Sequence, residues 1–455
     1  MSIQTINPAT EEKLAAYPLL SSKDVDLLLE RADKAFLGWR ETAFEFRRQH
    51  MLALSDLLRR KKKELALLIA REMGKPIAQG EAEIEKCAWL GEHYAEKADE
   101  YLKPQTIQTE LQKSTVYYQP LGIVFAIMPW NFPFWQVYRC AIPAIMAGNA
   151  VILKHAPVTT GCGFAIEKLF IEAGFPPHLF QQAVVDNEGA AAIIAHKKIA
   201  SLSFTGSEKA GRVVAANAAS HLKKSVLELG GSDPYLVLDD ADLDLAADCI
   251  IKSRLSNCGQ VCIAAKRIIA VASVHDELVA KIQQRLQHYA MGEPGNPETT
   301  LGPMAREDLR DTLHQQVLES VKQGARLVEG GVLPAGPGFY YPPTLLVNVK
   351  PGMTAFEEEL FGPVIAVIQV DSEEEGIRLA NQSPYGLAGA VFTRDIVRGE
   401  DIAKNRIEAG SCFVNALVAS DPRLPFGGIK HSGYGRELSR EGILEFVNIK
   451  TVAIK

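Results

Sequence analysis

The chain is poor in cysteine, with seven in 455 residues, an odd number. The cysteines show neither the paired spacing of a zinc site nor a disulfide framework, so we expect a reducing compartment and no metal.

Long apolar runs are also absent. No stretch reaches the roughly 20 apolar residues of a bilayer span, and the opening segment MSIQTINPATEEKLAAYPLL lacks a basic part followed by an apolar core. These absences predict a cytoplasmic protein without a membrane partner.

Clusters of like charge are missing as well. The 49 lysines and arginines and 55 acidic residues give a formal net charge of −6, and no basic run forms a stripe. We therefore expect no nucleic-acid partner and a small-molecule ligand. The length exceeds the usual size of one hydrophobic core, which predicts two or three domains.

Two stretches alternate short β-branched runs with helical runs. The first lies between Leu121 and Gly230 and predicts a parallel sheet with crossover helices, an architecture that commonly binds dinucleotides. The second follows Gly231 and predicts another α/β domain, with the glycine pair as a hinge. From Lys23 to about Leu102 the apolar spacing is helical. Within this part, EAEIEK from Glu81 to Lys86 is interpreted as a solvated helix face without a role.

Cys262 and Glu228 are the most informative pair of residues. Cys262 follows Gly259 in NCGQVCIAAKR, and Glu228 ends the apolar run VLEL before two glycines. A thiol nucleophile and a carboxylate base indicate an acyl enzyme that one residue forms and the other hydrolyses. A buried inert thiol and a carboxylate bonded to a backbone amide are the alternatives. Cys258 is a candidate for a disulfide with Cys262 under oxidation.

The segment PWNFPFWQVYR places Asn131, Trp135 and Arg139 four residues apart, on one face of a helix. The Asn131 amide could stabilise an oxyanion, and the Arg139 guanidinium could hold a substrate carboxylate by two hydrogen bonds. The alternatives are a capping asparagine, a core tryptophan and a surface arginine. In FTGSEKAG, Gly206 and Gly211 bracket a helix start, which alone is a weak indication of a phosphate site.

Six motifs stand in the order found in aldehyde dehydrogenases: PWNFPFW, FTGS, VLELGGSDP, NCGQVCIAAKR, EELFGPV and PFGGIKHSGYGRE. From Ile6 to the last strand, the chain resembles this family. The resemblance implies an α/β, aldehyde-dehydrogenase-like fold. Its parts would be a Rossmann-type dinucleotide domain (residues 1–106 and 125–229), an α/β catalytic domain (230–430) and small oligomerisation strands (107–124 and 431–455). A homodimer or a homotetramer is expected, and the terminal strand NIKTVAIK could join a sheet edge of a neighbouring subunit.

The resemblance also implies roles for individual residues. Cys262 is the implied nucleophile, Glu228 the general base, and Asn131 with the Cys262 backbone amide the oxyanion hole. The residues implied to line NAD or NADP are Trp130, Lys154, Gly206, Ser207, Leu229, Glu359 and Phe361. The implied reaction passes through a cysteine thiohemiacetal and a thioester, without a metal.

Within the family, LKHAP, MPWNFPFWQV, VLELGGSDP and the segment 419–421 are most similar to bacterial succinate semialdehyde dehydrogenases. This similarity implies NAD(P)-dependent oxidation of succinate semialdehyde, with Arg139, Trp135 and Ser420 contacting the substrate. There is one departure, because some such enzymes carry a second arginine where this chain has Ser256.

Cofactor choice depends on a second position. Pro157 stands where NAD-selective members often carry a glutamate, so with Lys154 and His155 nearby we expect NADP to be accepted beside NAD.

Three alternatives stay open. The first is an aldehyde dehydrogenase for another small aldehyde. The second is a cofactor-free thiol esterase, which would need a histidine base, and no histidine lies near Cys262 or Glu228 in the sequence. The third is a binding protein that has lost catalysis, which the presence of Cys262, Glu228 and Asn131 disfavours.

Overall fold

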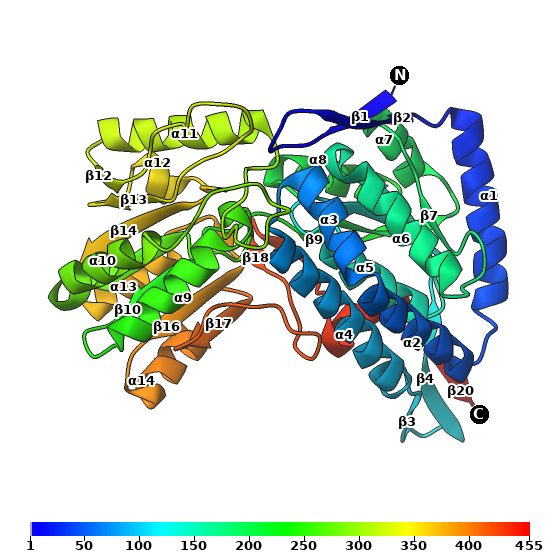
Figure 1. Cartoon of the computed structure of the whole chain (residues 1–455). Helices are drawn as coiled ribbons and strands as arrows, with labels where there is room; N and C mark the ends of the chain where they lie inside the picture. Colours follow the sequence, from blue (N-terminus) through cyan, green and yellow to red (C-terminus); the bar gives the residue numbers. More distant parts are fainter. Residues whose placement is uncertain (1) are drawn as a thin grey trace.

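A computed structural model describes residues 2–455, and it contains two α/β sheets that lie side by side (Figure 1). The first sheet has six strands. In spatial order they are β19 (Gly433–Tyr434), β9 (Lys224–Glu228), β8 (Ile199–Thr205), β5 (Ile123–Met128), β6 (Ala150–His155) and β7 (Phe180–Gln182). All neighbours pair in parallel except β19, which runs antiparallel to β9. The predicted parallel sheet between residues 121 and 230 is confirmed.

Helices connect the strands of this first sheet. They are α5 (Trp135–Met146), η1 (Pro157–Thr159), α6 (Thr160–Glu172), α7 (Asn187–Ala195) and α8 (Glu208–Ser220). Because the strands β5, β8 and β9 are parallel, the residues that follow them gather at one edge of the sheet. That edge faces the second sheet.

The second sheet has seven strands and confirms the second α/β region. In spatial order they are β12 (Arg326–Glu329), β13 (Thr344–Val347), β14 (Val364–Val370), β11 (Arg267–Val271), β10 (Pro234–Val237), β16 (Ala388–Phe392) and β17 (Ser411–Val414). Only β12 is antiparallel to its neighbour. The accompanying helices are α9 (Leu243–Leu255), η2 (Ser256–Gly259), α10 (Ala272–Leu286), α11 (Glu307–Lys322), α12 (Thr354–Glu357), α13 (Glu373–Asn381), α14 (Ile396–Asp401) and η3 (Ile402–Arg406).

The predicted helical region forms four helices: α1 (Ser22–Trp39), α2 (Phe44–Arg60), α3 (Lys62–Met73) and α4 (Ile77–Tyr101). The start of α1 is fixed by a capping box, in which Ser21 and Asp24 satisfy each other's backbone amides. Helix α4 packs against α2, α3 and α5. It therefore lies between the amino-terminal helices and the first sheet, with one face toward the centre of the molecule (Figure 1).

A three-stranded antiparallel sheet projects from the body beside the carboxyl terminus (Figure 1). It consists of β3 (Gln105–Ile107), β4 (Lys113–Pro120) and β20 (Val447–Ile454). Strand β20 pairs along its whole length with β4 of the same chain, and its side chains after Val447 are exposed. Short pairs also join β1 (Ser2–Ile6) to β2 (Lys13–Pro18) and β15 (Tyr385–Gly386) to β18 (Ile429–Lys430), and α15 (Ser439–Leu444) precedes β20.

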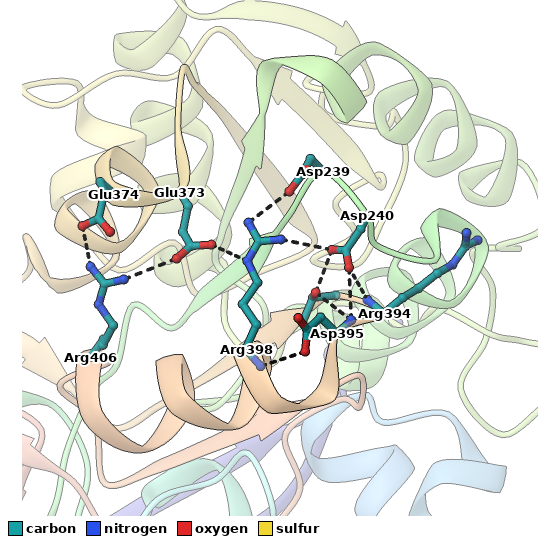
Figure 2. A network of polar contacts seen from close by, with 9 residues as sticks. Asp239, Asp240, Glu373, Glu374, Arg394, Asp395, Arg398 and Arg406 are labelled. Carbon is teal, nitrogen blue, oxygen red and sulfur yellow. Dashed lines mark hydrogen bonds and ion pairs between the residues drawn. The ribbon is translucent and has the colours of Figure 1, made fainter.

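A polar network attaches α14 to the second sheet (Figure 2). The Arg398 guanidinium lies 2.5 Å from Glu373, 3.1 Å from Asp239 and 3.6 Å from Asp240. Arg406 contacts Glu373 and the adjacent glutamate. The network joins three segments that are distant in the sequence.

Among residues 2–455, no helix has the length and apolar character needed to cross a membrane.

Candidate active site

Two cavities meet at Cys262, between the two sheets. One has a volume of about 290 Å³ and the other about 400 Å³, and Cys262 and Gln136 line both. Cys262 is the residue that the sequence predicted as the nucleophile. It is thus placed where two separate ligands could reach the same sulfur atom.

The loop before Cys262 has an unusual backbone. After α9 ends, Asn257 and Cys258 both adopt left-handed conformations, with φ values of 51° and 55°, and Gly259 follows with φ 72°. A Cβ atom on Gly259 would lie 2.1 Å from the carbonyl oxygen of Gly362, so no other residue fits this turn. The sharp turn carries Cys262 out of the helix and into the space between the sheets.

Asn131 lies before α5, not on one helical face with Trp135 and Arg139 as the sequence predicted, and it is fixed against this loop. Its Nδ2 donates to the Gln260 carbonyl oxygen at 3.0 Å, and Asn257 Nδ2 donates to the Asn131 carbonyl oxygen at 2.7 Å. Because an amide nitrogen carries two hydrogens, Asn131 keeps one donor for a second partner. Asn131 and Cys262 line the larger cavity together. This arrangement fits the predicted oxyanion hole.

The Cys262 thiol is stabilised in its neutral form. Burial raises its pKa to about 11, while the positive charges of Arg139 and Lys266 oppose this shift. Lys266 Nζ donates to the Cys262 carbonyl oxygen at 2.5 Å and to Glu359 Oε1 at 2.6 Å. The nucleophile loop is therefore connected to the wall of the larger cavity by an almost fully buried cation. The Cys258 thiol is also buried, which raises its pKa to about 12.

The charge of Arg139 acts on both Glu228 and Cys262, but the Glu228 carboxyl group is not part of either cavity wall. Both its oxygens are buried without a hydrogen-bond partner. A Cβ on Gly427 would lie 2.7 Å from Glu228 Oε1, so this glycine leaves the space that the carboxyl group fills. Burial, followed by the nearby Glu437 carboxylate, raises the pKa of Glu228 well above its ordinary value.

The larger cavity contains most residues that were predicted to bind the dinucleotide. Trp130 packs edge-on against Phe361, with ring centroids 5.9 Å apart. Ser207 caps the amino terminus of α8, where backbone amides and the helix dipole favour a phosphate. The predicted residues on its wall are Trp130, Gly206, Ser207, Leu229, Glu359 and Phe361. Pro129, Thr205, Arg306 and Leu309 also line it and were not predicted. The donors and the aromatic wall fit a dinucleotide.

Lys154 is the exception in this set. It stands near the end of β6 and is half-buried, which lowers its pKa, but it does not line the larger cavity. Its neighbour His155 is buried, and a ring nitrogen lies 2.9 Å from the Pro133 carbonyl oxygen. Burial lowers the pKa of His155 to about 4, so the ring is neutral and already engaged. His155 therefore offers no positive charge to a cofactor phosphate, and of the two groups named for NADP only Lys154 does.

The smaller cavity holds the residues predicted to contact the substrate. Trp135, Arg139 and Ser420 all line it, and Ser256, where some related enzymes carry an arginine, lines it too. The Arg139 guanidinium is only 2% exposed and lies 2.7 Å from Glu437 Oε2. The interpretation of Arg139 as a surface residue is excluded. Its predicted role in binding a carboxylate stays a prediction, because its charge is already matched by Glu437.

Several residues that line this smaller cavity were not predicted from the sequence. The segment EAEIEK was interpreted as solvated, yet Glu83 is buried and Lys86 lines the cavity. The two residues are three apart on α4 and therefore share a face. The sequence did contain a sign that this part of α4 is buried. Glu83 is next to the apolar Ile84 and four residues before the apolar Cys87, so all three lie toward the same inward face of the helix.

Comparisons with known proteins agree with this geometry. Residues 1–452 match the family described as the aldehyde dehydrogenase family. A succinate semialdehyde dehydrogenase [NAD(P)+] of Escherichia coli is 46% identical, covering 98% of this chain and 97% of that protein. A probable succinate-semialdehyde dehydrogenase [NADP(+)] of Synechocystis is 44% identical over the whole of both chains. The solved structure of a Streptococcus pyogenes succinic semialdehyde dehydrogenase with NADP+ superposes with a TM-score of 0.97, at 35% identity over 99% of each chain.

Proposed function

Because this chain belongs to the aldehyde dehydrogenase family, we propose that it oxidises succinate semialdehyde to succinate with NADP or NAD. The observation that carries the proposal is the position of Cys262 at the junction of two cavities. One cavity has the lining of a dinucleotide site, and the other is rich in cationic and aromatic side chains. The full-length identity to proteins named for this substrate supports the choice of aldehyde.

The proposed mechanism begins at Cys262. After its thiol proton has passed to water, the sulfur attacks the aldehyde carbon and forms a thiohemiacetal, whose oxyanion is stabilised by the free amide hydrogen of Asn131 and the Cys262 backbone amide. A nicotinamide held by the walls of the larger cavity would supply the hydride acceptor that this carbon needs to become a thioester. Glu228 then takes a proton from water, which hydrolyses the thioester and releases the acid. For this step Glu228 must move its buried carboxyl group toward the sulfur.

The larger cavity supports use of both dinucleotides. Pro157 begins η1 beside β6, so no carboxylate occupies the position from which a glutamate would repel a ribose phosphate. Trp130, Gly206, Ser207, Leu229, Glu359 and Phe361 would hold the cofactor, and Lys154 is proposed to contact its adenosine half. A thiol esterase is not favoured, because the walls of both cavities, all within residues 2–455, contain no histidine that could serve as its base.

We also propose the division into domains given by the resemblance. Residues 1–106 and 125–229 would bind the dinucleotide, residues 230–430 would carry the nucleophile, and residues 107–124 with 431–455 would join subunits in a homodimer or homotetramer. The projecting sheet and the exposed side chains of β20 support this assignment. All seven cysteines are free thiols, which fits the reducing cytoplasm proposed as its location.

A panel of aldehydes tests the proposed function. Purified protein is mixed with NADP or NAD and with succinate semialdehyde, butanal or glutarate semialdehyde, and cofactor reduction is followed by absorbance. We expect the highest kcat/KM with succinate semialdehyde and measurable turnover with both cofactors. Turnover of butanal without a preference for succinate semialdehyde would refute the substrate, and no reduction with any aldehyde would refute the reaction.

A further inference from the structure

The cationic groups of the smaller cavity differ in how their charges are balanced. Lys75 forms a buried ion pair with Glu83, and Arg139 forms one with Glu437. Lys86, on α4, lines the same cavity but has no carboxylate within ion-pair distance among residues 2–455. Lys86 is thus a cation on the wall of the proposed substrate cavity, and no neighbouring carboxylate forms an ion pair with it.

The surroundings of Lys86 hold its ammonium group in place. Nζ donates to the Ser420 hydroxyl oxygen at 2.8 Å and lies 4.3 Å from the centre of the Trp135 ring. Asp421, whose charge acts on Lys86, is already bound by Arg423 through two contacts of 2.9 and 2.7 Å. A lysine has three N–H donors, so two remain for a ligand.

The position of Trp135 under Lys86 is itself fixed by α4. Glu83 Oε1 accepts the backbone amides of Phe134 and Trp135 at 2.9 and 3.0 Å, at the start of α5. A carboxylate at a helix amino terminus is favourable for both the hydrogen bonds and the helix dipole. Since Glu83 and Lys86 are one turn apart, the same helix places the ammonium group and the ring beneath it.

We propose that Lys86, together with the Ser420 hydroxyl, binds the distal carboxylate of the substrate. This inference rests on the proposed function and identifies the charged group that selects a semialdehyde acid over an uncharged aldehyde. A carboxylate beside Lys86 replaces the missing counter-charge and can accept two charge-assisted hydrogen bonds. Arg139 stays paired with Glu437 and contributes less net charge to the ligand.

Electrostatics of the site agree with this assignment. Burial, followed by the positive charge of Arg139, lowers the pKa of Lys86 to about 8, and Cys87, Asp421 and Glu83 oppose the shift. An anion that binds beside Lys86 would stabilise the charged form of the lysine and so offset the effect of burial. The ammonium form is present below about pH 8, so binding of the carboxylate would weaken as the pH rises above that value.

The test compares two substrates in the variant Lys86→Met, which removes the charge and keeps the length. The quantity measured is the ratio of kcat/KM for succinate semialdehyde to kcat/KM for butanal, with NADP saturating. We expect this ratio to fall about 10- to 100-fold, as is typical for loss of hydrogen bonds between charged groups. Lys86→Arg should recover part of the ratio. Lys252→Met is the matched control, because Lys252 also lines this cavity but is exposed.

Binding of succinate to the protein, measured by calorimetry, gives a second readout that does not require turnover. We expect Lys86→Met to bind succinate at least about tenfold more weakly than the wild type does. Equal losses on succinate semialdehyde and butanal, or unchanged succinate binding, would overturn the Lys86 inference. A wild type without preference for succinate semialdehyde would instead refute the proposed function, and the calorimetric comparison would still decide the role of Lys86.

Discussion

The buried pair of Arg139 and Glu437 should control the pH dependence of thioester hydrolysis. Both groups act on Glu228, and they act in opposite directions: Glu437 raises the pKa of Glu228 and Arg139 lowers it. A general base works only in its deprotonated form, so the turnover rate rises as the pH passes through its pKa. Arg139→Met should therefore move the rising limb of the pH profile to higher pH, and Glu437→Gln should move it to lower pH.

The expected size of the shift follows from Coulomb's law. Two unit charges about 6 Å apart interact by about 3 kcal/mol at an effective dielectric constant of about 20, which corresponds to about two pKa units. The partner of each deleted charge remains nearby, so we expect shifts of about one to two pH units. In the double variant the two deletions offset each other, and the profile should lie close to that of the wild type.

The assay is the pH profile of kcat for butanal, an uncharged substrate that isolates Glu228 from any effect on substrate carboxylate binding. A rapid burst of reduced cofactor before the steady state would establish that hydrolysis limits the rate. Shifts of both single variants in the same direction, or no shift in either, would refute the assignment of these charges to Glu228. Circular dichroism of each variant controls for loss of the fold, since breaking a buried ion pair is costly.

Three further predictions concern other parts of the molecule. Glu228→Gln should retain the burst of reduced cofactor but lose steady-state turnover by about 100-fold or more, because the base acts only on the thioester; an unchanged steady rate would contradict this. Lys266→Met should slow alkylation of Cys262 by iodoacetamide, followed by peptide mass spectrometry, because Lys266 lowers the pKa of this thiol. Arg398→Ala should lower the free energy of unfolding by about 1 to 2 kcal/mol in urea, whereas Arg394→Ala, whose side chain is exposed, should change it little.

Local patterns were sufficient to predict much of the fold and part of the site. The alternation of strands and helices predicts both sheets, since each run carries its own periodicity. Asn131 and Gly206 follow parallel strands, so their meeting at one edge is a consequence of sheet topology. The position of Cys262 in a loop could be predicted from the local sequence alone, because Gly259 and the polar residues around it indicate a sharp turn.

Contacts between distant segments were not predictable in this way. Arg139 and Glu437 meet only because the segment after β18 returns to the first sheet. Lys86 was misinterpreted because a mixed-charge helix segment is ordinarily solvated, and nothing local shows that a cavity lies beside it. The orientation of Glu228 away from both cavities depends on Gly427, which is nearly 200 residues later in the chain.

The edge strand β19 has a consequence for how the protein is made. It pairs Gly433 with Glu228, so the first sheet acquires its outermost strand from the final part of the chain. On a ribosome, the other five strands of that sheet emerge early and must wait, with one border unpaired, until translation has nearly finished. An incomplete polypeptide would therefore expose the unpaired edge of β9, the strand that ends at Glu228, which makes late truncations prone to aggregate.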